Sequence, residues 1–317
     1  MTYEPPFLRT PRIEALCMDI AESVGSLGPN SKLSTNPTLH RKLRISTIYS
    51  SLLVEGNELS LDQVTAIIDG KRVLGNQNDI REVENARNAY DMLPDLDPLS
   101  LDDLLLAHKA MMTGLVPEAG RFRSKNAGVF EGERLIHAGT PTKYVPSLME
   151  DLFSWLACSD MHPLLRSCVF HYEFEFIHPF ADGNGRTGRL WHTLLLSKWR
   201  HALAWLPVES VILKRQQDYY RAFSESESKG ECGPFVTYML EAIKEALAPY
   251  SGNQASATLL REEALLAFVL DRPHATIAEI AEHLGVSRAT VDRLIAALRA
   301  NGRLNRVGGR RAGHWEV

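Results

Sequence analysis

Residues 178–189 constrain this chain more than any other segment. They read His-Pro-Phe-Ala-Asp-Gly-Asn-Gly-Arg-Thr-Gly-Arg and lie between two stretches whose apolar residues recur every three or four positions. Because the residue before a proline disfavours helical geometry, we expect the first helix to end near His178. A second helix is expected over 186–199. The segment therefore predicts two helices joined by a glycine-rich loop, a unit suited to a helical domain.

The glycine-rich loop has the composition of an anion site. Gly183, Asn184 and Gly185 come just before the second helix, where free backbone N–H groups and the helix dipole attract negative charge. Glycine and asparagine tolerate the positive φ angles that turn successive N–H groups inward. Arg186 and Arg189 are one helical turn apart and can both bind phosphate oxygens. The loop is thus predicted to hold phosphate groups.

Two further side chains add chemistry to this loop. Asp182 supplies a hard oxygen ligand, and Mg²⁺ beside phosphates is usually held by one or two carboxylates. His178 can take up a proton near neutral pH. A glycine loop or a histidine beside a proline is usually structural when it occurs alone. A base, a metal ligand, an anion loop and two arginines within one short segment instead predict attack on a phosphoryl group.

The segment resembles the signature of the Fic family, HPFx[D/E]GN[G/K]RxxR, and matches it at every defined position. The resemblance implies a magnesium-dependent protein adenylyltransferase, in which His178 deprotonates a Tyr, Ser or Thr hydroxyl of a target protein and Asp182 binds Mg²⁺. That hydroxyl attacks the α-phosphorus of ATP, so AMP is transferred and pyrophosphate leaves; UTP or another nucleotide stays open as the donor. The residues assigned to ATP by the resemblance are Gly183, Asn184, Gly185, Arg186, Thr187, Gly188 and Arg189.

Two other segments are assigned to the site by the same resemblance. Gly128–Gly139 places two short apolar pieces around a polar turn, which predicts a β-hairpin. In the family such a hairpin is a flap on which the target protein docks by strand addition, and Leu135, Ile136 and His137 would line it at the ATP site. A plain surface hairpin is the alternative. Tyr219 resembles a position near the nucleoside, although a tyrosine at this spacing is equally typical of a core.

A motif upstream predicts an internal inhibitor. Ser51-Leu-Leu-Val-Glu55-Gly56 ends a helical pattern and resembles the Fic inhibitory motif [S/T]xxxE[G/N]. A negative charge at a helix C-terminus is disfavoured by about 0.3–1 kcal/mol, so Glu55 should seek a cation. The resemblance gives Arg189 as that partner, which would keep the transferase off. A solvated Glu55 is the alternative, and in some relatives this glutamate instead supports removal of AMP.

The C-terminal segment predicts a DNA-binding type of fold. Residues 275–298 read as helix, glycine turn and helix, and resemble a winged helix-turn-helix. Residues 286–317 carry seven Arg against two acids, a formal +5, so the rest of the chain carries about −9. This charge favours DNA contact, but an interaction or dimerisation module is an equal alternative. Candidate DNA contacts are Ser287, Arg288, Thr290 and Arg293. The alternative for the whole chain is a transcriptional regulator with a vestigial Fic body.

Length and composition complete the prediction. A chain of 317 residues suits one large domain and one small one, here an all-α Fic fold with a small β-hairpin flap, followed by a winged helix. We expect a helical N-terminal region over 1–94 with the inhibitory helix at about 43–56, a core over 95–250, and the winged helix over 256–317. The N-terminus lacks a secretory pattern, no long apolar run suits a membrane, and the four cysteines lack metal spacing. These features predict a cytoplasmic protein with buried, reduced thiols, and a homodimer stays open.

Overall fold

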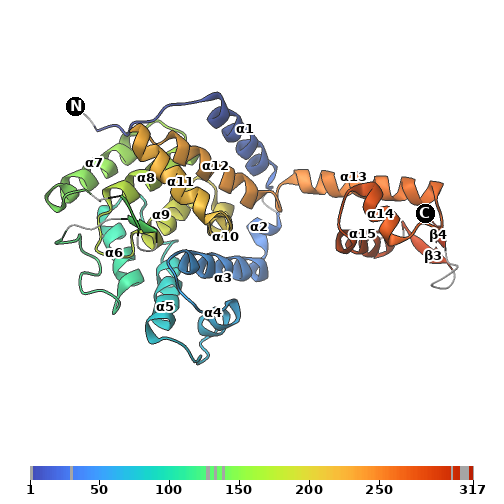
Figure 1. The fold of residues 1–317 in the computed structure, drawn as a ribbon, viewed down its shortest axis with the longest axis horizontal. Helices are drawn as coiled ribbons and strands as arrows, with labels where there is room; N and C mark the ends of the chain where they lie inside the picture. The colour runs from blue at the N-terminus through green and yellow to red at the C-terminus, as the bar shows by residue number, and fades with distance from the viewer. Residues whose placement is uncertain are drawn as a thin grey trace. The chain divides into compact units, whose positions relative to one another are not determined.

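The structure, a computed structural model, describes residues 3–28, 31–125, 129–131, 134–137, 140–300, 303–307 and 314–316 (Figure 1). It divides into two compact units, Met1–Leu247 and Ala248–Val317. The first unit contains both the predicted N-terminal region and the predicted core. In the described residues, no helix is long and apolar enough to cross a membrane.

The first unit is a helical assembly with one small hairpin. Its helices are α1 (Pro11–Ser26), α2 (Lys32–Thr35), α3 (Pro37–Val54), α4 (Leu61–Ile68), α5 (Gln77–Asp91), α6 (Leu101–Met112), α7 (Val145–Cys158), α8 (Pro163–Ile177), α9 (Asn184–Trp199), α10 (Val208–Lys214), α11 (Gln216–Lys229) and α12 (Gly233–Leu247). Two short 3₁₀ helices, η1 (Thr142–Tyr144) and η2 (His201–Trp205), and the strands β1 (Val129–Glu131) and β2 (Arg134–His137) complete it. The predicted all-α class is therefore confirmed.

Helices α8 and α9 form the centre of this unit and pack against each other. Both helices are buried around most of their circumference, as expected for helices surrounded by others. The fully buried rings of Phe170, Phe174 and Trp191 lie on this pair. Helices α6, α7 and α12 pack on α8 or α9, and α3 packs against α5, α9 and α10. The loop between α8 and α9 is consequently fixed from several sides.

The predicted helix ends are close to those observed. Helix α3 ends at Val54, with Glu55 as its C-cap and Gly56 at a φ of 88°. Helix α8 ends at Ile177, one residue before His178. The predicted start of α9 at Arg186 was wrong by two residues, because Gly183 is the N-cap in the left-handed region and Asn184 already lies in the first turn.

The predicted hairpin is present as far as the structure describes it. Strands β1 and β2 are antiparallel and pair Glu131 with Arg134 and Phe130 with Leu135, with an irregularity next to Val129. The side chains of Leu135, Ile136 and His137, which were predicted to line the ATP site, lie outside the described part of the chain. Their role stays a prediction.

The second unit has its own hydrophobic core and the elements of a winged helix-turn-helix. It comprises α13 (Gly252–Asp271), α14 (Ile277–Leu284), α15 (Arg288–Ala300), β3 (Asn305–Val307) and β4 (His314–Glu316). Val291, Leu298 and Trp315 are buried in its core. A capping box at Thr276 begins α14, and Gly285 ends it in the left-handed region. Helix α13 begins at Gly252, four residues before the predicted start of the winged helix at 256.

The four cysteines are free thiols, as predicted. Cys168 and Cys232 are buried and Cys17 is partly buried. Cys158, the last residue of α7, is exposed, so the prediction that these thiols are buried was wrong for this residue.

Candidate active site

His178 lies at the C-terminus of α8 in an unusual backbone conformation. Its φ of 53° and ψ of 62° make it the one non-glycine residue with positive φ among the described residues. Such a conformation costs about 1–3 kcal/mol and persists only when the surroundings impose it. Arg123 imposes it: its Nε donates to the His178 carbonyl oxygen at 2.6 Å, and its backbone N–H donates to the Pro179 carbonyl at 2.9 Å.

A buried carboxyl group lies behind His178. Oε2 of Glu175 is 4.0 Å from Nδ1 of His178, one helical turn along α8. Burial raises the pKa of Glu175 to about 8, so this side chain is mostly neutral at pH 7. Gly188 permits the close approach of α9 at this point, because a Cβ there would lie 2.8 Å from Oε1 of Glu175. His178 therefore has a polar but largely uncharged neighbour.

Asn184 closes the loop between the two helices. Its Oδ1 accepts from the backbone N–H of Phe180 at 2.8 Å, and its Nδ2 donates to the Phe180 carbonyl at 2.9 Å. The side chain is only 2% exposed. Asn184 is therefore committed to the loop's own backbone. Gly183, with a φ of 83°, supplies the left-handed residue that turns the chain into α9.

Replacing Asn184 with alanine should destabilise the protein. It would leave the Phe180 N–H and carbonyl groups without their partners, at a cost of about 2–4 kcal/mol for the two groups. Urea denaturation followed by circular dichroism measures this loss. The matched control Asn88→Ala, on the exposed face of α5, should change the free energy of unfolding by less than about 0.5 kcal/mol. Equal stability of the two variants would contradict the role given to Asn184.

A histidine from α6 supports the same loop. The ring of His108 stacks on Phe180, with centroids 3.6 Å apart. Its Nδ1 accepts from the Gly120 N–H at 2.9 Å, so Nε2 carries the proton and donates to the Asp182 carbonyl at 3.0 Å. Burial lowers the pKa of His108 to about 4, which keeps the ring neutral at pH 7. His108 thus fixes the backbone of the residue that was predicted to bind Mg²⁺.

The Asp182 carboxylate is suited to a cation whose remaining ligands are phosphate oxygens and water. Its Oδ1 accepts from the Gly183 N–H at 2.6 Å and from Arg186 Nη2 at 2.9 Å, while the side chain is 54% exposed. The described residues contain no cluster of three or more His, Cys, Asp or Glu side chains that could hold a metal. Mg²⁺ commonly binds one or two carboxylates and completes its shell with phosphate oxygens and water. The exposed carboxylate of Asp182 fits this mode of Mg²⁺ binding.

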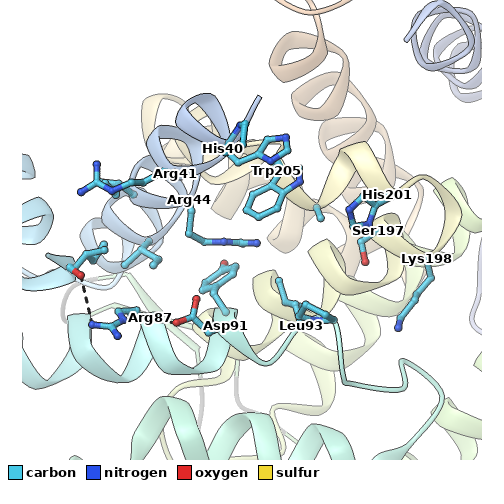
Figure 2. Close-up of a pocket in the computed structure, with 17 residues that line it drawn as sticks. His40, Arg41, Arg44, Arg87, Asp91, Leu93, Ser197, Lys198, His201 and Trp205 are labelled. Atoms are coloured by element: carbon cyan, nitrogen blue, oxygen red, sulfur yellow. Dashed lines mark hydrogen bonds and ion pairs between the residues drawn. The ribbon is translucent and has the colours of Figure 1, made fainter. Parts of the chain in front are cut away.

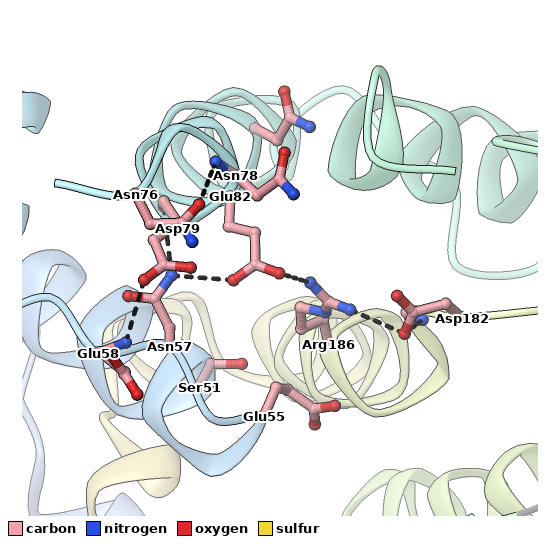
Figure 3. A network of polar contacts seen from close by, with 12 residues as sticks. Ser51, Glu55, Asn57, Glu58, Asn76, Asn78, Asp79, Glu82, Asp182 and Arg186 are labelled. Carbon is pink, nitrogen blue, oxygen red and sulfur yellow. Dashed lines mark hydrogen bonds and ion pairs between the residues drawn. The ribbon is translucent and has the colours of Figure 1, made fainter. Parts of the chain in front are cut away.

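Arg186 is held between two carboxylates (Figure 3). Its Nη1 lies 2.7 Å from Oε1 of Glu82 in α5, and its Nη2 contacts Asp182. Asn57 donates to the other oxygen of Glu82 at 2.9 Å, which fixes that carboxylate in turn. Arg186 is only 3% exposed. The sequence prediction missed Glu82 and Asn57.

Arg189 is engaged by the predicted inhibitory segment. Its Nη2 lies 2.7 Å from Oε1 of Glu55 and 2.9 Å from the Ser51 carbonyl oxygen, and its Nε donates to Ser51 Oγ at 3.0 Å. Burial alone would lower the pKa of Arg189, but the Glu55 carboxylate outweighs it and raises this pKa. Gly185 makes room for the contact, since a Cβ there would lie 2.4 Å from Glu55 Oε1.

Three residues predicted to contact ATP lie in the packed interior. Tyr219 is 5% exposed, and its hydroxyl is 3.3 Å from His171 Nε2, which favours the core alternative. Thr187 is 1% exposed on the inner side of α9. Gly188 faces Phe174 and Glu175 of α8. Gly188 thus lies on the face of α9 that packs on α8, Thr187 is buried in the same helix, and Tyr219 lies in α11 beside His171 of α8.

The site thus consists of two buried helices joined by a tight glycine-containing loop, with the Glu55 carboxylate at the end of α3 on the last arginine of the segment. Comparison with known proteins identifies the family. Residues 98–196 match the Fic/DOC family, and residues 261–314 match an HTH domain. A crystal structure of a Fic family protein from Desulfovibrio desulfuricans G20 is 41% identical, with a TM-score of 0.76 over 99% of this chain and 98% of that chain. The chain belongs to the Fic family.

Curated relatives are longer than this chain. Protein adenylyltransferase fic-1 of Caenorhabditis elegans is 27% identical over 265 residues, which are 78% of this chain and 50% of that protein. Protein adenylyltransferase Fic of Drosophila erecta is 30% identical over 214 residues, which are 64% of this chain and 41% of that protein. The chain thus spans about half the length of the curated relatives it matches. A C. elegans Fic-1 structure covering 78% of this chain, at 24% identity and a TM-score of 0.60, shares the fold.

Proposed function

We propose that this protein is an adenylyltransferase that transfers AMP from ATP to a Tyr, Ser or Thr hydroxyl of a target protein, and also to itself. The observation that carries the proposal is the position of His178 beside the N-terminus of α9, with the loop between them fixed by Asn184 and Arg123. A base and an anion site at one point are what attack on a phosphoryl group requires. The names of the curated relatives support the same activity.

The proposed reaction rests mainly on positioning. The N–H groups at the start of α9 attract the phosphates of ATP, and the left-handed backbone of His178 holds its ring at the end of α8. His178 takes the proton from the attacking hydroxyl as the bond between oxygen and the α-phosphorus forms. The bond between the α-phosphorus and the bridging oxygen breaks, and pyrophosphate leaves. Mg²⁺ bound to Asp182 would supply charge neutralisation for the phosphates.

We also propose that this arrangement is switched off. Residues 178–189 are called the cassette from here on. Arg189 is its last arginine, and in the family it holds the γ-phosphate. Its guanidinium is occupied by Ser51 and Glu55, and it is 2% exposed. ATP would therefore bind without an arginine on its γ-phosphate, in a pose unsuited to in-line attack.

Four free thiols, one of them exposed, suit activity in a reducing compartment such as the cytoplasm.

The experiment that tests the function is mass spectrometry of the intact Glu55→Gly variant, in which the proposed inhibition is released, after incubation with ATP. We expect a mass increase of one AMP in the presence of Mg²⁺ and none with EDTA. The described residues offer a cation few ligands besides Asp182, so EDTA should remove the bound Mg²⁺ readily. Asp182→Ala should reduce modification at least about tenfold. The control Asp160→Ala, at an exposed acid between α7 and α8, should leave modification of the Glu55→Gly variant unchanged. Modification that proceeds equally in EDTA would contradict the metal-dependent mechanism.

A second function is favoured by the HTH match and by the exposed face of α15. The Ser287 hydroxyl caps this helix by accepting from the Thr290 N–H at 3.3 Å, and Arg288 and Arg293 are exposed. We propose that this face binds DNA phosphates. In a mobility shift with random duplexes, Arg288→Ala with Arg293→Ala should weaken binding roughly tenfold and make it less salt-dependent. Arg72→Ala in the first unit is the control, and salt-independent binding would favour a protein-interaction module.

A further inference from the structure

A cavity lies in the first unit, on residues other than those of the cassette (Figure 2). It is formed by the N-terminal half of α3, the end of α5, the end of α9 and η2, and its volume is about 670 Å³. Cavities of about 300–1,000 Å³ are typical of small-molecule sites. Much of its wall is apolar, and includes Ile45, Ile48, Ile68, Leu93 and Trp205. The cavity is thus large enough for a compact organic ligand.

The side chain of Arg44 enters this cavity without a hydrogen-bond acceptor. Its guanidinium carbon lies 4.8 Å from the ring centroid of Tyr90 and 4.9 Å from that of Trp205, and Figure 2 shows it extending beneath Trp205. Among the described residues, this guanidinium makes no hydrogen bond and no ion pair. A guanidinium has five N–H donors. Arg44 is half-buried, and none of its nitrogen atoms is among the fully buried ones that lack a partner, so its donors are open to the cavity. Burial lowers the pKa of Arg44.

The other charges around the cavity do not supply the missing anion. Arg41 is paired with Asp69, and Arg87 with Asp91, whose Oδ2 is 3.6 Å from the Arg87 Nε. Asp91 is the one acidic residue in the lining. The lining also holds His40, whose Nε2 is 2.8 Å from the Leu33 carbonyl oxygen, and the exposed residues His201 and Lys198. Lys198 has no carboxylate partner among the described residues, so the cavity has an excess of positive charge.

The buried carboxyl group of Glu209 uses one oxygen for hydrogen bonds, and its Oε2 is buried without a partner in the described part of the chain. Oε1 of Glu209 accepts from the Tyr90 hydroxyl at 3.2 Å and from the Thr193 hydroxyl at 3.3 Å. Its charge favours the ionised form of Arg44, but no contact within ion-pairing distance joins the two. Glu209 instead anchors the ring of Tyr90, on which the guanidinium rests. The donors of Arg44 are left for a group that enters from the cavity.

We propose that this cavity binds an organic oxyanion, a carboxylate or phosphate attached to a planar apolar body. The anion would contact Arg44, Lys198 would add positive charge at the edge of the cavity, and the apolar body would pack against Trp205 and the isoleucines of α3. An inorganic anion would leave the apolar wall uncovered. Arg44 precedes Glu55 by three helical turns on α3, so an occupant would touch the helix that carries the proposed inhibitor.

The test is isothermal titration calorimetry of the full chain without nucleotide. The probes are naphthalene-2-carboxylate, 2-naphthyl phosphate, neutral naphthalene-2-carboxamide and inorganic phosphate. We expect both naphthyl anions to bind and the amide to bind at least about tenfold more weakly, because hydrogen bonds to a charged group are the stronger ones. Arg44→Met should weaken anion binding roughly 10- to 100-fold, and Lys198→Met severalfold. The control Arg72→Met should not change it.

Several results would overturn the site. These are no binding of either naphthyl anion up to concentrations on the order of 1 mM, equal binding of the amide, or naphthyl phosphate binding that Arg44→Met leaves unchanged. The last result would place the phosphate at the cassette loop instead. If Arg44→Met does not fold, Arg44→Lys and Lys198→Met decide: both must weaken carboxylate binding. Because binding is measured without ATP, failure here and failure of the proposed transferase activity are distinguishable.

Discussion

Glu55→Gly is expected to raise self-modification with AMP roughly 10- to 100-fold over wild type. The estimate follows from the charge-assisted hydrogen bond between Glu55 and Arg189, since such bonds contribute about 1.5–3 kcal/mol. Loss of the carboxylate leaves Arg189 with only the Ser51 oxygens, neither of which carries a charge. The γ-phosphate of ATP can then replace Glu55. Labelled ATP and intact-mass measurement quantify the gain.

Two matched variants separate the charge of Glu55 from its position. Glu58→Gly removes an exposed glutamate three residues further along and should leave the rate unchanged. Glu55→Gln keeps the shape but not the charge, and should give an intermediate gain because an amide oxygen still accepts from Arg189. A rate for Glu55→Gly within twofold of wild type would show that this contact does not limit AMP transfer.

The elements around this switch could be predicted because their signals are local. Glycine just after an apolar stripe marks the end of α3, where Glu55 is the C-cap. The Glu55 to Arg189 contact could be anticipated because an acid at a helix C-terminus needs a cation. The family motif supplied which cation it is.

The residues that fix the loop could not be predicted, because their signals are not local. Glu82 lies 104 positions before Arg186, and Arg123 lies 55 positions before His178. Periodicity tells which face of α5 or α6 is apolar, but not which partner a polar residue on that helix will meet. For Asn184, the sequence predicted that the residue belongs to the loop but not what its side chain does there. Its tolerance of positive φ suggested a phosphate cradle, whereas Gly183 takes the left-handed position and Asn184 closes the loop with its side chain.

His178→Asn is expected to reduce AMP transfer by about 10²- to 10⁴-fold, the usual contribution of a positioned general base. Asparagine is the informative replacement because it tolerates the left-handed conformation that His178 adopts, whereas alanine would add backbone strain to the loss of the base. The change is best made in the Glu55→Gly background, where the starting rate is high enough to measure a large fall.

Equilibrium binding of ATP distinguishes loss of chemistry from loss of structure. The α9 N-terminus, Asn184 and Arg189 do not depend on the imidazole, so the dissociation constant for ATP should change by less than about threefold in the double variant. His201→Asn, an exposed histidine in η2, controls for removing an imidazole elsewhere in the same unit. Transfer by the double variant within twofold of Glu55→Gly alone would show that another group takes the hydroxyl proton. The buried Glu175, 4.0 Å from His178, would then be the next residue to replace.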